Sequence, residues 1–126
     1  GRVCLPFSHV PMMTNQTSGK TLLQINFTHD LRDEEYQALT ARVAPAIAEV
    51  DGLEWKIFLT GSDRRAGGVY LFRDEAAADA YLNGPIITGL RGHPAIGEPQ
   101  IRKSGIMADI TAVTRGPVNG PELPAT

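Results

Sequence analysis

Residues 52–82 constrain the fold more than any other stretch, because two strand-like segments and a helix-like segment follow one another closely. Residues 53–59 and 66–72 are rich in aromatic and branched side chains, which is typical of strands. The polar link at residues 60–65 holds turn residues and charges, so the two segments predict a β-hairpin. Asp74 can cap the alanine-rich run that follows. The block therefore predicts strand, hairpin loop, strand and helix.

Upstream of this block, the sequence changes from a strand period to a helical one. Residues 21–27 alternate between apolar and polar side chains, which predicts a half-buried first strand. Residues 31–50 place apolar side chains three and four positions apart and so predict an amphipathic helix. Pro45 should bend this helix, because it removes a backbone donor. Asp51 and Gly52 should end it, with the glycine in a left-handed conformation.

Downstream, residues 74–83 predict a short helix that Gly84 and Pro85 interrupt, and residues 86–90 are expected to continue as a second helical turn or two. Glycines and prolines at residues 92–99 indicate a loop. Residues 100–113 predict the last strand, with Gly105 as a bulge. The domain should thus span residues 21–113, followed by an extended tail at residues 114–126.

Residues 1–20 show no period. We interpret them as an N-terminal arm or as upstream-encoded or vector-derived sequence, with Met12 or Met13 as a candidate natural start. Residues 1–13 should lie outside the core.

The element order β-α-β-β-α-β predicts an α+β, ferredoxin-like fold with a four-stranded antiparallel sheet and both helices on one face. One row of strand residues is mostly apolar and another is mixed. We group Leu23, Ile25, Phe27, Trp55, Ile57, Leu59, Val69 and Leu71 in the apolar row, and Gln24, Asn26, Lys56, Phe58, Tyr70 and Phe72 in the mixed row. The uncovered face is too apolar for water and calls for a partner.

Composition narrows the function classes. Net charge is −2 without a basic stripe, which argues against nucleic acid as a partner. No apolar run approaches the roughly 20 residues of a membrane helix. Cys4 is the single cysteine, which favours a reducing compartment, and we expect a cytoplasmic protein. The three histidines are far apart without ligand spacing, so we predict no metal and no organic cofactor.

Three sequence patterns resemble the YdhR-like family of monooxygenases: Gly-Leu-x-Trp-Lys from Gly52, Ala-Gly-Gly-Val-Tyr-Leu-Phe from Ala66, and Asp-Glu followed by Tyr81-Leu82. The resemblance covers roughly residues 21–114. It implies a dimeric α+β barrel, in which two ferredoxin-like sheets pack face to face, and hence a homodimer. It also implies similarity to cofactor-free, quinone-forming enzymes, from which Trp55 carries over as a pocket residue.

The candidate site residues combine aromatic walls with polar groups, the usual composition of a small-molecule pocket. We predict His29 and Tyr70 as catalytic residues, with His29 as a general base and the Tyr70 hydroxyl stabilising an anion. The predicted substrate-binding residues are Trp55, Asn26, Lys56, Tyr36 and Phe58. Whether Trp55 and Tyr70 share a face depends on the strand register, because a slip by one residue reverses every side chain.

Two classes of function follow. The first is a cofactor-independent monooxygenase, in which a phenol or anthrone-like substrate supplies the electrons and the protein removes a proton. The second is a dimer that binds a small hydrophobic molecule without chemistry. A lactone isomerase or lyase of the same superfamily is a third functional hypothesis.

Overall fold

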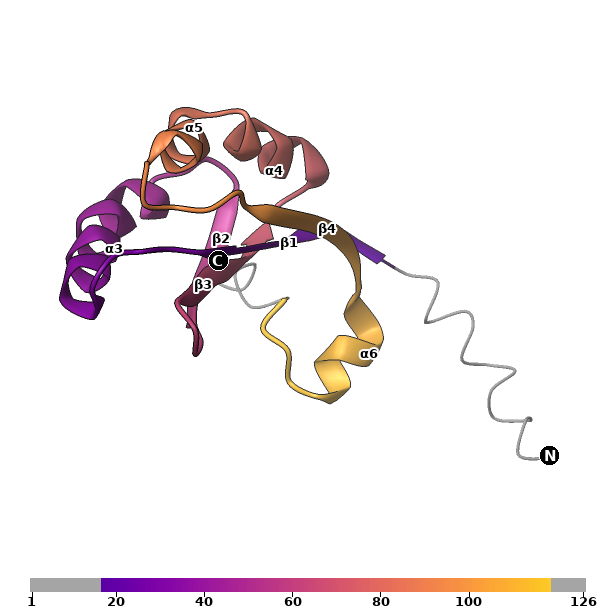
Figure 1. Ribbon diagram of the computed structural model, residues 1–126. Helices are drawn as coiled ribbons and strands as arrows, with labels where there is room; N and C mark the ends of the chain where they lie inside the picture. Colours follow the sequence, from indigo (N-terminus) through magenta and orange to yellow (C-terminus); the bar gives the residue numbers. More distant parts are fainter. Residues whose placement is uncertain (1–16, 119–126) are drawn as a thin grey trace.

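The structure is a computed structural model that describes residues 17–118, with side chains from residue 19 onward. Figure 1 shows its helices and strands. In chain order they are β1 (Thr17–Thr28), α3 (Asp33–Ala48), β2 (Leu53–Thr60), β3 (Arg65–Phe72), α4 (Glu75–Leu82), α5 (Pro85–Gly92), β4 (Gln100–Met107) and α6 (Ala108–Val113).

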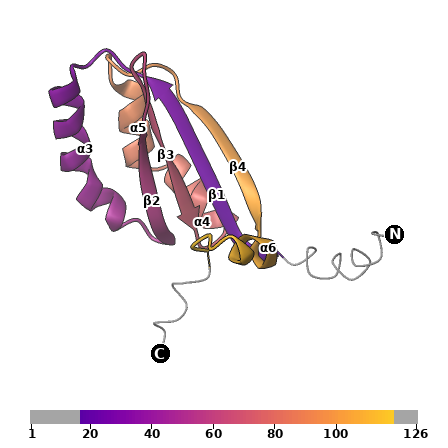
Figure 2. The same cartoon turned by 90° about the horizontal axis from the view of Figure 1, so that it is seen from below.

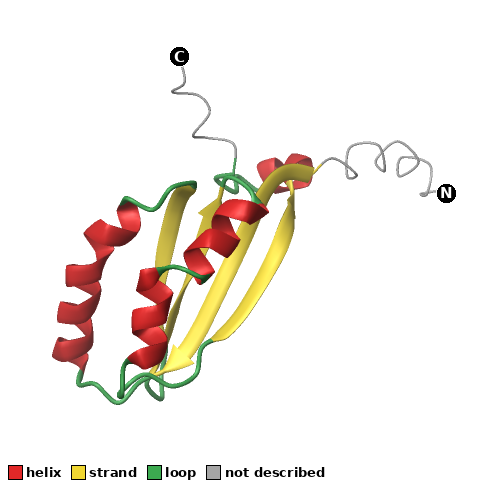
Figure 3. Ribbon diagram, turned by 90° about the horizontal axis from the view of Figure 1, so that it is seen from above, coloured by secondary structure: helices red, strands yellow, loops and turns green. Residues whose placement is uncertain are grey.

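The four strands form one antiparallel sheet in the order β2-β3-β1-β4. Helices α3, α4 and α5 lie on one side of it (Figures 1 and 3). Seen from the other side, the strands are largely open, with α6 across one end (Figure 2). This confirms the predicted α+β, ferredoxin-like architecture.

The strand register confirms the predicted rows within β2 and β3 but shows that the side chains of β1 were assigned to the wrong rows. Tyr70 pairs with Leu23 on one neighbouring strand and with Lys56 on the other. Directly opposed residues point to the same face of a sheet, so Lys56 and Tyr70 join Leu23 beneath the helices. Trp55 pairs with Leu71 and faces the open side. A register irregularity between Leu53 and Trp55 contributes to this arrangement.

The main core lies between the sheet and the helices. Phe72, Leu23 and Ile25 are fully buried there, against Ala78 of α4 and Ile87 of α5. Burial of this apolar surface is the dominant favourable term in folding, so it fixes which face of the sheet the helices cover.

Local signals around the hairpin unit are confirmed. Asp74 accepts a hydrogen bond from the Ala77 amide at 2.8 Å and caps α4. Gly52 has a φ of +84°, and a Cβ there would lie 2.5 Å from the Ala77 Cβ. Helix α3 continues through Pro45 but ends at Ala48, slightly before the predicted end.

The predicted limits of the sheet need two corrections. Strand β1 begins at Thr17, so residues 17–20 belong to the sheet. Gly19 has a φ of +80° and lies in the irregular stretch between Thr17, which pairs with Met107, and Thr21, which pairs with Gly105. Strand β4 ends at Met107, and residues 108–113 form α6. Ile106, Ile110 and Val113 are spaced by four and three, a helical pattern that the strand interpretation overlooked.

The segment after α6 folds back onto the open face instead of extending as a tail. Val118 packs against Leu71 and Ile106. The Trp55 indole donates a hydrogen bond to the Pro117 carbonyl at 2.8 Å. Lys20 donates to the Val118 carbonyl at 2.6 Å. The predictions for residues 1–13 and 119–126 lie outside the described residues.

Within the described part of the chain, no helix is long and apolar enough to cross a membrane.

Candidate functional site

A cavity of about 290 Å³ lies between α3, α5 and the helix-facing side of β2 and β3. Figure 3 shows the helices that lie on this side of the sheet. Leu39 and Val43 of α3 face Ile86 and Leu90 of α5 across it. The cavity is therefore mostly apolar, and a few polar groups determine its chemistry.

Lys56 is the charged residue that lines the cavity. Its Nζ lies 3.8 Å from the ring centroid of Phe58 and 4.5 Å from that of Tyr70. The ring faces stabilise an ammonium, whereas burial disfavours it, and burial lowers the pKa of Lys56 to about 8. Among residues 17–118, no carboxylate forms an ion pair with this amine. A substantial fraction of Lys56 is therefore a neutral amine near physiological pH.

The Tyr70 hydroxyl is the second polar group of the cavity. Tyr70 is 3% exposed, and the Tyr81 hydroxyl donates a hydrogen bond to its oxygen at 3.1 Å. Burial, together with the neighbouring Tyr81, raises the pKa of Tyr70 far above its usual value. Tyr70 therefore remains protonated and can donate a hydrogen bond, but it cannot act as a base.

Tyr36 of α3 separates the cavity from a polar cleft. Its ring lines both spaces and stacks on the His29 ring at a centroid distance of 4.4 Å and an interplanar angle of 8°. His29 is buried behind it, and its Nδ1 accepts a hydrogen bond from the Leu31 amide at 3.1 Å. A neutral His29 therefore carries its proton on Nε2. Its predicted role as general base stays a prediction, and it does not line the apolar cavity.

Trp55 and Asn26 lie on the opposite side of the sheet. Trp55 packs with Leu71 and Val118, and Asn26 lines a separate cleft with Gln100. The register therefore separates Trp55 from Tyr70, a point that the sequence alone left open. The structure instead brings together Lys56, Tyr70, Phe58 and Tyr36 from the predicted set.

Two cavity residues were missed as site residues. Tyr81 of α4 was not among the predicted site residues, and its hydroxyl pairs with that of Tyr70. His93 lines the cavity at the end of α5, and its Nδ1 accepts a hydrogen bond from the Ala95 amide at 3.0 Å. Its Gly-His-Pro context indicated only a loop, so no local signal placed it in a site.

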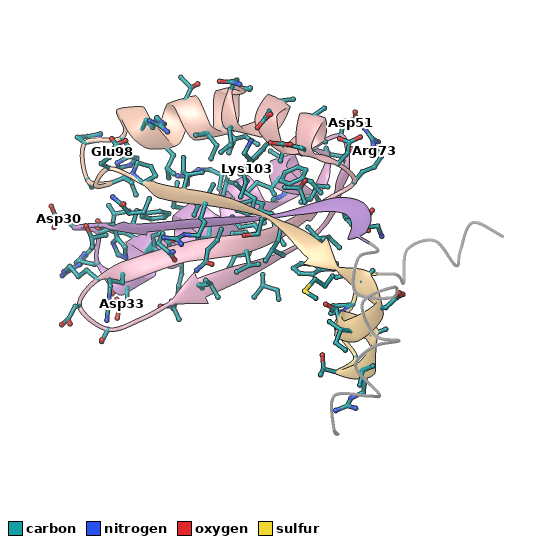
Figure 4. All side chains as sticks on the ribbon, turned by 90° about the vertical axis from the view of Figure 1, so that its right-hand side faces the viewer. Asp30, Asp33, Asp51, Arg73, Glu98 and Lys103 are labelled. Carbon is teal, nitrogen blue, oxygen red and sulfur yellow. The ribbon has the colours of Figure 1, made fainter. Side chains whose placement is uncertain are left out.

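Within the described region, and unlike Lys56, other charged side chains at the surface form ion pairs with carboxylates. On the helix side of β4, Lys103 contacts Glu75 at 2.8 Å and Asp79 at 2.6 Å (Figure 4). These carboxylates raise the pKa of Lys103. Asp51 and Arg73 are 3.4 Å apart at the surface (Figure 4). Lys103 is therefore an exposed, ion-paired lysine with which the partly buried Lys56 can be compared.

Several solved structures share this α+β architecture. A protein of unknown function from Nitrosomonas europaea is 23% identical, with a TM-score of 0.59 over 74% of this chain and 94% of that one. SnoaB, a cofactor-independent oxygenase from Streptomyces nogalater, is 18% identical, with a TM-score of 0.55 over 68% and 91%.

A third solved structure is that of the heme-degrader MhuD from Mycobacterium tuberculosis. It is 21% identical, with a TM-score of 0.53 over 70% of this chain and 97% of that one. At these identities the likeness concerns the fold. A comparison with curated proteins gave no match.

The family to which the protein belongs is identified by its amino-acid sequence. The model of the family described as "Putative mono-oxygenase ydhR" matches residues 22–117, which is most of the chain. The protein belongs to this monooxygenase family.

Proposed function

We propose that the protein is a cofactor-independent monooxygenase that oxidises a small hydroxylated aromatic compound in the cavity beside Lys56. The observation that carries the proposal is a partly buried amine, without a carboxylate partner among the described residues, beside aromatic rings that line the cavity. The family's monooxygenase description and the shared fold with a cofactor-independent oxygenase support the reaction class.

The size of the cavity limits the substrate. An apolar cavity of about 150 Å³ is sufficient to bind benzene. The cavity of about 290 Å³ described here suits roughly two fused rings. Its apolar walls favour the ring system, and the Lys56 end favours a hydroxyl group.

Lys56 can supply the first chemical step. Its neutral amine accepts the proton of the bound phenol, and the resulting ammonium stabilises the phenolate. The Tyr70 hydroxyl supports the same anion by donating a hydrogen bond. Because a phenolate is far more electron-rich than a phenol, it can pass electrons to molecular oxygen.

The overall reaction balances without an added reductant. For 1-naphthol, the ring carbon opposite the hydroxyl loses its hydrogen and gains one oxygen atom, and the hydroxyl becomes a carbonyl. The product is a naphthoquinone, and the second oxygen atom leaves as water with the two hydrogens. The substrate supplies all four electrons, so each quinone formed consumes one molecule of oxygen.

The test measures oxygen uptake and quinone formation with 1-naphthol for the parent, Lys56→Met and Lys103→Met. Lys56→Met keeps the unbranched stem and removes the amine, so the rate should fall at least about tenfold, as when an acid–base group is lost. Lys103→Met removes a surface lysine from a strand and should leave the rate unchanged.

The pH profile gives an independent check on Lys56. If the neutral amine is the base, the rate in the parent should rise with pH, with an inflection near 8. Naphthol binding without oxygen uptake would instead indicate a binding protein. Turnover of a lactone without oxygen uptake would indicate an isomerase or lyase.

We further propose a homodimer in which two open sheet faces pack together. Ile57 on the open face is 51% exposed, beside Leu59 and Val69. Such a row is more stable when covered by a partner, and face-to-face packing of two sheets is a common solution. Sedimentation at micromolar concentration tests this, because a monomer would contradict it.

A further inference from the structure

The three lysines of the sequence, Lys20, Lys56 and Lys103, occupy different environments. Lys20 contacts Glu54 at 2.9 Å, and Lys103 contacts Glu75 and Asp79. In the described part of the chain, Lys56 has aromatic rings around its amine and no carboxylate in ion-pair contact. Its nitrogen therefore remains available to a molecule in the cavity.

Gly68 makes the position of Lys56 possible. A Cβ built on Gly68 would lie 2.5 Å from the Lys56 Cε and 3.4 Å from its Nζ. The lysine stem therefore passes over the backbone of β3 where a side chain would otherwise stand. This arrangement keeps the amine beside the faces of Phe58 and Tyr70 at the cavity wall.

We propose that Lys56 is also a carbonyl-binding nucleophile, which captures small aromatic aldehydes or ketones in this cavity as a reversible imine. Desolvation of a lysine in an apolar pocket is a known route to an activated amine, and the lowered pKa of Lys56 is consistent with this environment. The inference goes beyond the proposed oxygenase function and does not depend on it.

The step needs no co-reactant. The neutral amine nitrogen attacks the carbonyl carbon, and one proton moves from nitrogen to the former carbonyl oxygen. The resulting carbinolamine loses water as the carbon–nitrogen double bond forms. Both hydrogens of the amine leave in that water, and no atom is oxidised or reduced. Tyr70 remains protonated and can donate a hydrogen bond to the departing oxygen.

Reductive trapping tests the proposal. The full chain is incubated with benzaldehyde and cyanoborohydride at pH 7.5, and the benzyl adducts are mapped by peptide mass spectrometry. The three lysines and the terminal amine give separable sites. Lys56 should be labelled at least about tenfold faster than Lys103, because its neutral fraction is much larger at this pH. Equal or slower labelling of Lys56 would overturn the proposal.

Three variants separate the effect of the amine chemistry from that of local packing. Lys56→Arg keeps a cationic side chain that cannot form this imine, and it should lose the adduct while Lys103 labelling is unchanged. Gly68→Ala should displace the Lys56 stem and slow its labelling several-fold. Gly105→Ala, at a strand position where a Cβ meets nothing within 4 Å, should label like the parent.

The labelling assay also distinguishes imine formation from the proposed oxygenase function. Benzaldehyde has no hydroxyl group to oxidise, and the assay is run under nitrogen. Selective labelling without naphthol oxidation would therefore support the imine site and contradict only the oxygenase. If Gly68→Ala labels as fast as Gly105→Ala, the glycine does not position the amine, and the proposed architecture of the site is wrong.

Discussion

Two opposing effects act on Lys56. Burial penalises its charge, and the faces of Phe58 and Tyr70 compensate only in part. A lysine without a carboxylate partner among residues 19–118 costs folding stability at neutral pH, and such a cost is typical of residues kept for function.

The pH dependence of stability follows from this pKa. Lys56 binds its proton less tightly in the folded chain, with a pKa of about 8 against 10.5. Between these values the unfolded chain holds more protons, so stability should rise with pH. We expect a gain of about 1–2 kcal/mol between pH 7 and 9.5, measured by urea unfolding. Lys56→Met should remove this rise, and an unchanged slope would contradict the assignment.

The tyrosine pair provides a second prediction at the residue scale. Tyr70→Phe keeps the ring but leaves the buried Tyr81 hydroxyl without its acceptor. We expect a loss of about 1–2 kcal/mol in the free energy of unfolding. Naphthol oxidation should also fall about tenfold or more, because a donor to the developing anion is removed.

Tyr81→Phe is the matched control for this pair. It breaks the same hydrogen bond but keeps the Tyr70 hydroxyl in the cavity. A similar loss of stability with a smaller loss of rate would assign the catalytic part to Tyr70. If the two variants lose the same rate, the hydrogen bond between the tyrosines matters, rather than the Tyr70 donor itself.

At the scale of the elements, periodicity predicted the strands and main helices but not which side chains meet. Each strand alone shows its alternation, whereas the shared face depends on pairing with its neighbours. The sequence therefore identified Lys56, Tyr70 and Phe58 as candidates but left open whether Trp55 shares their face. The irregularity near Trp55 is a feature of the β2–β3 pair, and it has no signature in either strand alone.

The C-terminal part was the least predictable. Residues 108–113 contain β-branched residues, which favoured a longer strand, but their apolar spacing is helical. His93 reaches the cavity only because α5 ends beside it. Such placements come from tertiary packing, which local pattern does not report.

A prediction at this scale concerns the segment after α6. Trp55→Phe removes the donor to the Pro117 carbonyl and reduces packing against Val118. We expect a loss of about 1–3 kcal/mol in the free energy of unfolding. Because Trp55 lies across the sheet from the cavity, naphthol affinity should be unchanged. A weaker affinity would show that Trp55 contacts the ligand despite the register.

At the scale of the whole molecule, the two faces of the sheet differ in what they carry. One face holds the cavity beneath the helices, and the other carries an apolar row that the segment at residues 114–118 covers only in part. Figure 2 shows how much of the sheet this segment and α6 leave open. Separation of the faces lets ligand binding and assembly be altered independently.

The last prediction uses this separation to test the homodimer. Ile57→Asp places a charge in the middle of the proposed interface, where an unpaired carboxylate would be desolvated. Sedimentation of the parent at micromolar concentration should show a dimer, and the variant should sediment mostly as a monomer. Because Ile57 is half exposed and faces away from the cavity, the monomer should stay folded. Ala38→Asp adds the same charge on an exposed position of α3 and should leave the dimer intact. Dissociation of both variants would point to general charge repulsion, and a dimeric Ile57→Asp would place the interface elsewhere on the molecule.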